Sequence, residues 1–204
     1  MTRSTGLRAT LAVGLAAALA IGCFGETLRP RFYTLSPASG SAAGPALEPH
    51  PDLGIVIGPI EFPRYLDRPE IVRRDGSHRL VLADEHRWGG SLRSDFLRVV
   101  ADDVGRLLGT ARVVIYPAEP RFPAAYRLLL DLREFDGISG EKVVLRARWT
   151  IAAVEDGRAL AVEESRIEQP VASDSIEDLV AAESAALGNL NRQIAERMAA
   201  LAAP

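Results

Sequence analysis

The residues with the richest side-chain chemistry form one short run, Asp84-Glu85-His86-Arg87-Trp88. A carboxylate beside an imidazole could support general acid-base catalysis, so a hydrolase built on His86 is one interpretation of this run. Consecutive residues of an extended segment point to alternate sides, however, and we do not expect Glu85 to face His86. The other interpretation is structural: Arg87 and Trp88 pack and hydrogen-bond to hold the helix that follows them.

The rest of the sequence contains no familiar catalytic motif. It has no Gly-x-Ser-x-Gly elbow, no Gly-x-Gly-x-x-Gly loop, no Walker loop and no His-Glu-x-x-His pair. Because the chain has a single cysteine, a zinc site built on several thiolates is also excluded. We therefore expect no catalytic residue, no metal and no cofactor.

The single thiol, Cys23, lies where an exported bacterial protein would carry a lipid. Arg3 and Arg8 precede an apolar stretch, Leu11–Ile21, which ends in small residues directly before the cysteine. This is the form of a secretory signal, and the stretch is shorter than the roughly 20 apolar residues that span a bilayer. We predict that residues 1–22 are a lipoprotein signal peptide and that Cys23 becomes the lipid attachment site.

Two residues near the cysteine refine this prediction. Ala20 stands where such signals usually have leucine, so an ordinary cleavage site followed by a free thiol is the alternative. Phe24 follows the cysteine at the position where an aspartate commonly retains lipoproteins in the inner membrane. We therefore expect the mature chain to be lipid-anchored to the outer membrane and to face the periplasm.

The charge and length of the mature chain narrow its class. The 204-residue chain has 24 basic and 27 acidic side chains. Residues 1–22 contain two of the basic side chains, Arg3 and Arg8, and no acidic one, so the mature chain has 22 basic and 27 acidic side chains and a net charge of −5. That balance argues against nucleic acid as a partner. Roughly 180 residues suffice for one domain with a substantial core. No disulfide can support it, because the chain has one cysteine.

Periodic apolar residues predict a single α+β domain. Its mixed, mostly antiparallel β-sheet carries two main helices. Ser91 and Ser175 are placed to cap the helix N-termini, and Gly109 to end the first helix. Strands are expected at 31–35, 53–60, 71–74, 79–82, 112–116, 126–135, 143–151 and 158–168, and helices at 91–108 and 174–201.

Turns and loops complete the expected organisation. Asp75-Gly76, Asp136-Gly137 and Asp156-Gly157 are predicted to form turns between strands. Ser36 to Pro51 lacks periodicity, which predicts a mobile surface loop. The chain then divides into a signal peptide (1–22), a segment with the lipid anchor, a short strand and this loop (23–52), and the remainder of the single domain (53–204), which includes the strand at 31–35.

Several longer motifs follow one another along the mature chain. They are Arg31-Phe32-Tyr33-Thr34-Leu35, Ile57-Gly58-Pro59-Ile60-Glu61-Phe62-Pro63, Tyr65-Leu66-Asp67-Arg68-Pro69-Glu70-Ile71-Val72, Glu85-His86-Arg87-Trp88 and Ala147-Arg148-Trp149. In this combination the chain resembles the ABC-type transport auxiliary lipoprotein family, whose best-known branch is the PqiC-like lipoproteins. It departs from the family's usual form at Glu70, where glutamine is typical, and at Gly89-Gly90, where an acidic residue and a proline usually stand.

The resemblance implies a non-enzymatic lipoprotein that works with an Mce-domain protein and inner-membrane transporter components. Such systems move lipids or other apolar molecules between the inner and outer membranes, and the family allows assembly into a homo-oligomeric ring. A lipoprotein that binds an apolar ligand itself, and a hydrolase built on His86, are the alternatives. The residues expected to contact a partner, or alternatively to brace the fold, are Tyr65, Leu66, Asp67, Arg68, His86, Arg87 and Trp88.

Overall fold

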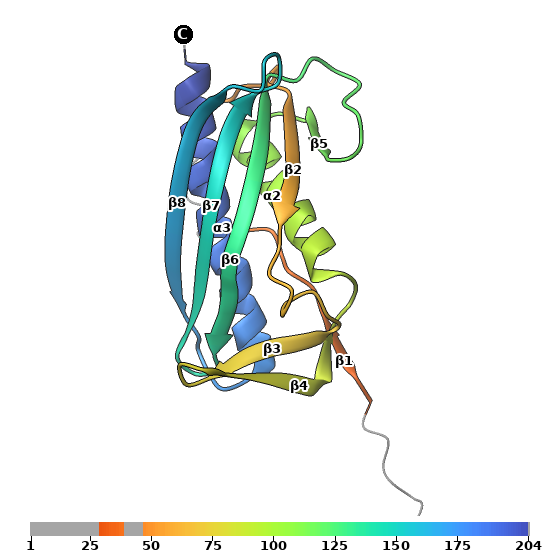
Figure 1. Ribbon diagram of the computed structural model, residues 1–204, viewed down its shortest axis with the longest axis vertical. Coiled ribbons are helices and arrows are strands. Elements are labelled where there is room, and N and C mark those ends of the chain that lie inside the picture. The colour runs from red at the N-terminus through yellow and green to blue at the C-terminus, as the bar shows by residue number, and fades with distance from the viewer. Residues whose placement is uncertain (1–28, 39–46, 204) are drawn as a thin grey trace, which may run out of the picture.

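Eight strands and two helices form in residues 29–38 and 47–203, the parts of the chain that this computed structural model describes (Figure 1). The predicted α+β class with two main helices is confirmed. In chain order the elements are β1 (Arg31–Tyr33), β2 (Ile55–Glu61), β3 (Glu70–Asp75), β4 (Arg79–Trp88), α2 (Leu92–Leu108), β5 (Val113–Ile115), β6 (Tyr126–Ile138), β7 (Lys142–Ala153), β8 (Ala159–Pro170) and α3 (Ile176–Ala202).

Five strands form a large sheet in the order β5-β2-β6-β7-β8. Alternate residues of β6 and β7 point toward the core, and Leu128, Leu145 and Ile151 are completely buried. β6, β7 and β8 form an antiparallel meander, as the alternation and the Asp156-Gly157 turn predict, whereas β2 lies parallel to both β5 and β6.

Both helices cover the same face of the large sheet, and no helix of the described residues lies on its other face (Figure 1). The predicted caps are confirmed. The Ser91 and Ser175 hydroxyls each accept a hydrogen bond from the amide three residues ahead, and Gly109 ends α2 with a left-handed φ of 63°. In the core, Phe96 of α2 meets the edge of Phe135 at a ring-centroid distance of 5.4 Å.

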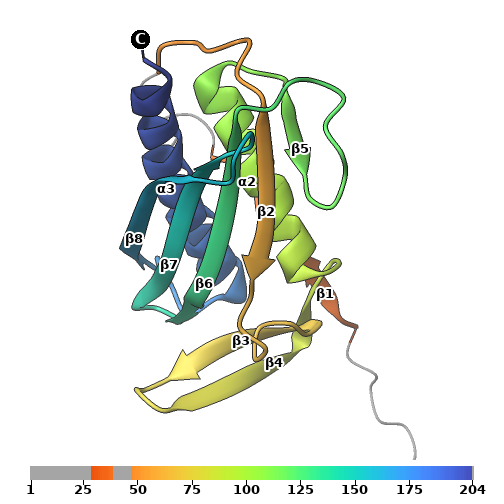
Figure 2. The same ribbon diagram turned by 45° about the horizontal axis from the view of Figure 1, so that its top comes forward.

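The remaining three strands form a separate small sheet, in the order β1-β4-β3, across one end of the large sheet (Figure 2). The sequence predicts its β3-β4 hairpin, whose turn uses Gly76 at a φ of 71°. It does not predict that β1 lies parallel to β4, because that pairing joins residues more than fifty positions apart. The strands therefore form two sheets, not the single sheet that the sequence predicts.

The prediction of a turn at Asp136-Gly137 is wrong. Both residues lie inside β6, and the chain turns after Ile138 instead. Asp136 is completely buried because Tyr65 and Arg74 bind its carboxylate. A side chain at position 137 would place its Cβ 2.6 Å from the carbonyl oxygen of Lys142, so glycine is required by close strand packing rather than by a turn.

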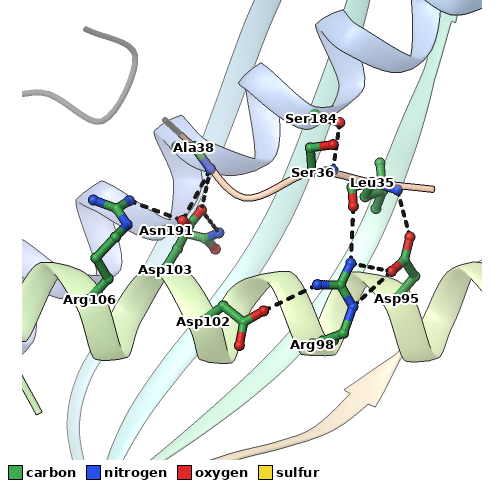
Figure 3. Close-up of polar contacts among 10 residues, drawn as sticks. All are labelled: Leu35, Ser36, Ala38, Asp95, Arg98, Asp102, Asp103, Arg106, Ser184 and Asn191. Atoms are coloured by element: carbon green, nitrogen blue, oxygen red, sulfur yellow. Dashed lines mark hydrogen bonds and ion pairs between the residues drawn. The ribbon is translucent and has the colours of Figure 1, made fainter. Parts of the chain in front are cut away.

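The first part of the predicted mobile loop is held in place. β1 ends at Tyr33, two residues earlier than expected, and the chain then continues as an extended segment, Leu35–Ala38, which we call the strap. Hydrogen bonds from the amides of Leu35, Ser36 and Ala38 to side chains of α2 and α3 fix its course (Figure 3). Of the rest of the predicted loop, 39–46 lies outside the described residues. Its last part, 47–51, is also held in place, because the amide of His50 donates a 2.8 Å hydrogen bond to the carbonyl of Leu108 in α2.

Candidate functional site

The small sheet brings together motifs that are far apart in the sequence. His86, Arg87 and Trp88 of β4 lie beside Arg31, Phe32 and Tyr33 of β1, respectively. Trp88 is buried at 5% exposure, His86 is half-buried and Arg87 is exposed. Of these three candidate partner-binding side chains, only Arg87 therefore projects fully into solvent.

His86 is engaged in a contact that holds β1 to β4. Its Nδ1 atom lies 2.8 Å from the Tyr33 hydroxyl, and the two rings are 5.5 Å apart between centroids. Glu85 is exposed while His86 is half-buried, as expected for consecutive residues of a strand. The imidazole has a phenol, not a carboxylate, as its hydrogen-bonding neighbour. This pair suits the pairing of β1 with β4 rather than general acid-base catalysis.

The turn from Tyr65 to Pro69 has a buried half and an exposed half. Leu66 is buried at 3% exposure, and the Tyr65 hydroxyl donates a 2.5 Å hydrogen bond to Asp136. Burial, together with this bond to Asp136, raises the pKa of Tyr65. These two side chains brace the fold, and they have little surface left for a partner.

The next two side chains of the turn are exposed and pair locally, though not with each other. Asp67 accepts a hydrogen bond from Arg93 of α2 at 3.0 Å, and Arg68 lies 3.8 Å from Glu70. Surface pairs of this kind add little stability, so both groups can exchange their present partner for another at small cost. Asp67 and Arg68, with Arg87, are the candidate residues that a partner could reach.

A buried carboxylate fastens the small sheet to the large one, and the sequence analysis missed it. Asp136 of β6 binds the guanidinium of Arg74 in β3 through both oxygens, one of them at 3.2 Å from Nη2. The hydrogen bond to Asp136 raises the pKa of Arg74. Glu183 of α3 is buried nearby, where burial and the negative charge of Asp136 raise its pKa well above the ordinary value.

The strap is bound to both helices by its backbone (Figure 3). Asp95 of α2 accepts a 2.6 Å hydrogen bond from the amide of Leu35, whose carbonyl accepts one from Arg98 at 3.0 Å. The amide of Ser36 donates to the Ser184 hydroxyl of α3 at 3.2 Å. Backbone groups that would be left unpaired in a simple surface loop thus have partners on two helices.

A second buried carboxylate, Asp103 of α2, closes the strap at its far end. It accepts a hydrogen bond from the amide of Ala38 at 3.1 Å, one from Asn191 of α3 at 2.9 Å and one from Arg106 at 3.0 Å. A Cβ at Gly188 of α3 would lie 2.9 Å from the Ala38 side chain, so the glycine allows the strap to approach the helix. Asp103 therefore joins α2, α3 and the strap in one contact.

The chain that leaves β1 toward the N-terminus leads to Cys23. That residue, with the predicted signal peptide, lies outside the described residues, which begin at Arg29. A load applied to residues before β1 would pass through β1 and the strap to both helices and the core. An open hollow of about 410 Å³ lies between the strap and α3, lined in part by Tyr33, Pro37 and Val180.

None of the helices formed by residues 29–38 and 47–203 combines the length and the apolar character that crossing a membrane requires. Within the same ranges, no three His, Cys, Asp or Glu side chains gather closely enough to hold a metal ion.

Fold and site together define a small α+β domain whose N-terminal strand is fastened to its helices. A family model described as the ABC-type transport auxiliary lipoprotein component matches residues 33–195. The chain therefore belongs to this family of transport accessory lipoproteins, as its motifs suggest. No curated protein matches it significantly.

Two solved structures show the same fold at low sequence identity. One, of an uncharacterized protein, has 14% identity and a TM-score of 0.68, and the match covers 83% of this chain and 99% of the other. The second, of a protein from Xanthomonas campestris, has 16% identity and a TM-score of 0.65, with 83% and 95% covered.

Proposed function

We propose that this protein is a lipid-anchored, non-catalytic accessory subunit of an envelope transport system that contains an Mce-domain protein and an ABC-type transporter. The system would move lipids or other apolar molecules between the inner and outer membranes. The observation that carries the proposal is the family match, because it spans almost the whole folded domain and describes a transport accessory lipoprotein.

The location of the protein follows from the predicted signal. Cys23 would carry the lipid, and Phe24 in the next position would direct the chain to the outer membrane, facing the periplasm. The strap supports a tethering role, since an anchor is mechanically useful only if the chain that follows it is bound to the body of the protein. The hydrogen bonds from the strap to Asp95, Ser184 and Asp103 provide that attachment.

The partner would bind the turn that leads into the small sheet. Asp67 and Arg68 are exposed there, and each forms a surface ion pair, with Arg93 and Glu70 respectively, that it can exchange for a contact with the partner. Tyr65 and Leu66 would contribute to partner binding only indirectly, by holding the turn that presents Asp67 and Arg68. A ring of identical subunits would bring several such surfaces to one partner.

The test is site-specific crosslinking in intact envelopes of cells that make the full chain. A photoreactive residue is placed at Arg68, and a control one at Glu155, which is exposed in the turn between β7 and β8 at the opposite end of the domain (Figure 1). We expect the probe at position 68 to capture an Mce-domain protein and the probe at 155 not to capture it. Capture at neither position would refute the proposed partner.

The same cells test the anchor. With Cys23→Ala, we expect a folded chain that leaves the outer-membrane fraction and a loss of the crosslink at position 68 of at least about tenfold, because tethering sets the effective concentration of the two partners. Unchanged recovery of the variant with the outer membrane would contradict the lipid attachment.

A further inference from the structure

Phe32 in β1 is an apolar side chain that the fold leaves uncovered. It is 65% exposed, more than any other large apolar residue in the described ranges. A single exposed apolar residue is ordinary on a protein surface and needs no explanation by itself. The position and the neighbours of Phe32 distinguish it from the others.

The strand register places Phe32 beside a basic side chain. Phe32 pairs with Arg87 of β4, and the next pair is Tyr33 with Trp88. Trp88 is buried at 5% exposure and points inward, so Phe32 and Arg87 share the outer side of the small sheet. We call this side the outer face.

Further charges surround the outer face. Arg29 precedes Phe32 by three residues and is exposed, as is Arg31, although Arg31 starts from the opposite side of β1 because neighbouring residues of a strand alternate. Two carboxylates stand against these arginines and Arg87: that of Glu85, exposed two residues before Arg87, and that of Glu70, which pairs with Arg87 in the strand register. An exposed aromatic side chain with arginines beside it is a combination by which peripheral proteins contact anionic phospholipid surfaces.

The predicted lipid at Cys23 confines the outer face to the neighbourhood of the membrane. Phe32 follows Cys23 by nine residues. Even a fully extended chain of that length spans no more than about 32 Å. The strap continues directly from β1 into the domain, so the outer face is the first folded surface that the tether reaches.

We propose that the outer face lies on the membrane, with the Phe32 ring at the level of the lipid headgroups and Arg29 and Arg87 over the phosphates of anionic phospholipids. This inference rests on the proposed lipid attachment at Cys23. It adds a second, non-covalent contact to the anchor, and it sets the orientation of the domain: the small sheet faces the outer membrane and α3 rises away from it.

The experiment uses the lipidated full-length product in vesicles rich in phosphatidylglycerol. Because the lipid occupies the Cys23 thiol, Pro30→Cys introduces one free thiol next to the outer face while Phe32 stays intact. A fluorescent dye on that thiol is quenched by brominated lipids if it lies at the membrane. The control is Val162→Cys, since Val162 is a 48% exposed apolar residue on β8, away from the small sheet.

We expect the brominated lipids to quench the dye at position 30 at least about threefold more than at position 162. Adding Phe32→Ser should lower quenching at position 30 to the control level, as should vesicles of phosphatidylcholine alone. Equal quenching at positions 30 and 162, or no effect of Phe32→Ser or of the vesicle composition, would overturn the proposed contact.

A parent chain with no added cysteine separates the two proposals. It takes up no dye if Cys23 is lipidated. Dye uptake by the parent would overturn the lipid attachment and with it the membrane contact, whereas an unlabelled parent with equal quenching at the two positions would overturn the membrane contact alone.

Discussion

Two completely buried aspartates, Asp103 and Asp136, each fasten a peripheral segment to the body of the domain, but they bind different kinds of groups. Asp103 holds the strap by a backbone amide, that of Ala38. Asp136 binds two side chains, that of Arg74 in the small sheet and that of Tyr65 in the turn before it. The contact with Asp103 requires only that the strap backbone pass close to it, whereas the contact with Asp136 requires particular side chains.

This difference determines how each contact responds to substitution. An amide is present whatever side chain the strap carries, so the strap tolerates change as long as it can lie flat against Gly188. The small sheet depends on one guanidinium that balances the charge of Asp136, and no backbone group can replace it. We therefore expect the larger loss of stability from breaking the side-chain contact.

The largest expected effect belongs to Arg74→Met. The variant keeps most of the side-chain volume but leaves the Asp136 carboxylate buried without a counter-charge, which typically costs about 3 kcal/mol or more. The free energy of unfolding, measured by urea denaturation at neutral pH, should fall by that amount. The control is Arg73→Met at the neighbouring half-buried position, where we expect a change within about 0.5 kcal/mol. A similar loss in both variants would show that the charge pair is not the cause.

Asp103→Asn should have a smaller effect. The amide oxygen of asparagine can still accept one hydrogen bond, but the charge-assisted bonds to Ala38, Asn191 and Arg106 are weakened, and we expect a loss of about 2 kcal/mol. The amide hydrogen of Ala38 should also exchange faster with solvent, since it loses its acceptor.

The matched control for Asp103 is its neighbour. Asp102→Asn removes an exposed carboxylate that is 3.1 Å from Arg98, and it should change the stability by less than about 0.5 kcal/mol. If both variants lose equal stability, or if exchange at Ala38 is unchanged in Asp103→Asn, the strap does not depend on Asp103.

The parts of this fold that could be predicted from sequence depend on neighbouring residues. The alternating leucines of β6, the helix caps at Ser91 and Ser175 and the turn at Gly76 are local patterns, and each is confirmed. The acidic-glycine pair at Asp136 matched a turn pattern equally well, yet it lies in a strand. Its partners Arg74 and Tyr65 are 62 and 71 positions away, beyond any local signal.

The candidate site likewise combines features that local sequence patterns reveal with contacts that they do not. The signal around Cys23 is a local pattern, and so is the motif that contains His86. The contacts of His86 and of the strap are not local: Tyr33 is 53 positions from His86, and Asp95 is 60 positions from Leu35. The strap itself consists of small and apolar residues without periodicity, and its order comes from acceptors on α2 that the strap sequence does not reveal.

A third buried carboxylate, Glu183, sharpens the comparison because it has no counter-charge of its own. Its Oε2 atom accepts no hydrogen bond within the described part of the protein, and burial followed by the charge of Asp136 raises its pKa well above 4.5. Asp136, by contrast, is bound by the side chains of Arg74 and Tyr65. Burial therefore favours the protonated form of Glu183, whereas the carboxylates of Asp103 and Asp136 are bound by donors.

The smallest expected effect, and the only one that stabilises, is that of Glu183→Gln. A raised pKa in the folded state means that the folded protein holds a proton which the unfolded chain releases above about pH 4.5, so the stability of the wild type is greatest at lower pH and falls as the pH rises toward the folded-state pKa. Glutamine removes this loss. Above about pH 4.5 the variant should therefore be more stable than the wild type, by a margin that grows as the pH rises toward the folded-state pKa, and at lower pH the two should converge. Glu177→Gln, on the exposed side of the same helix, should leave the pH dependence of the wild type unchanged. Parallel pH profiles for the wild type and Glu183→Gln would mean that the pKa of Glu183 is the same in the folded and the unfolded protein, and that its burial does not favour the protonated form.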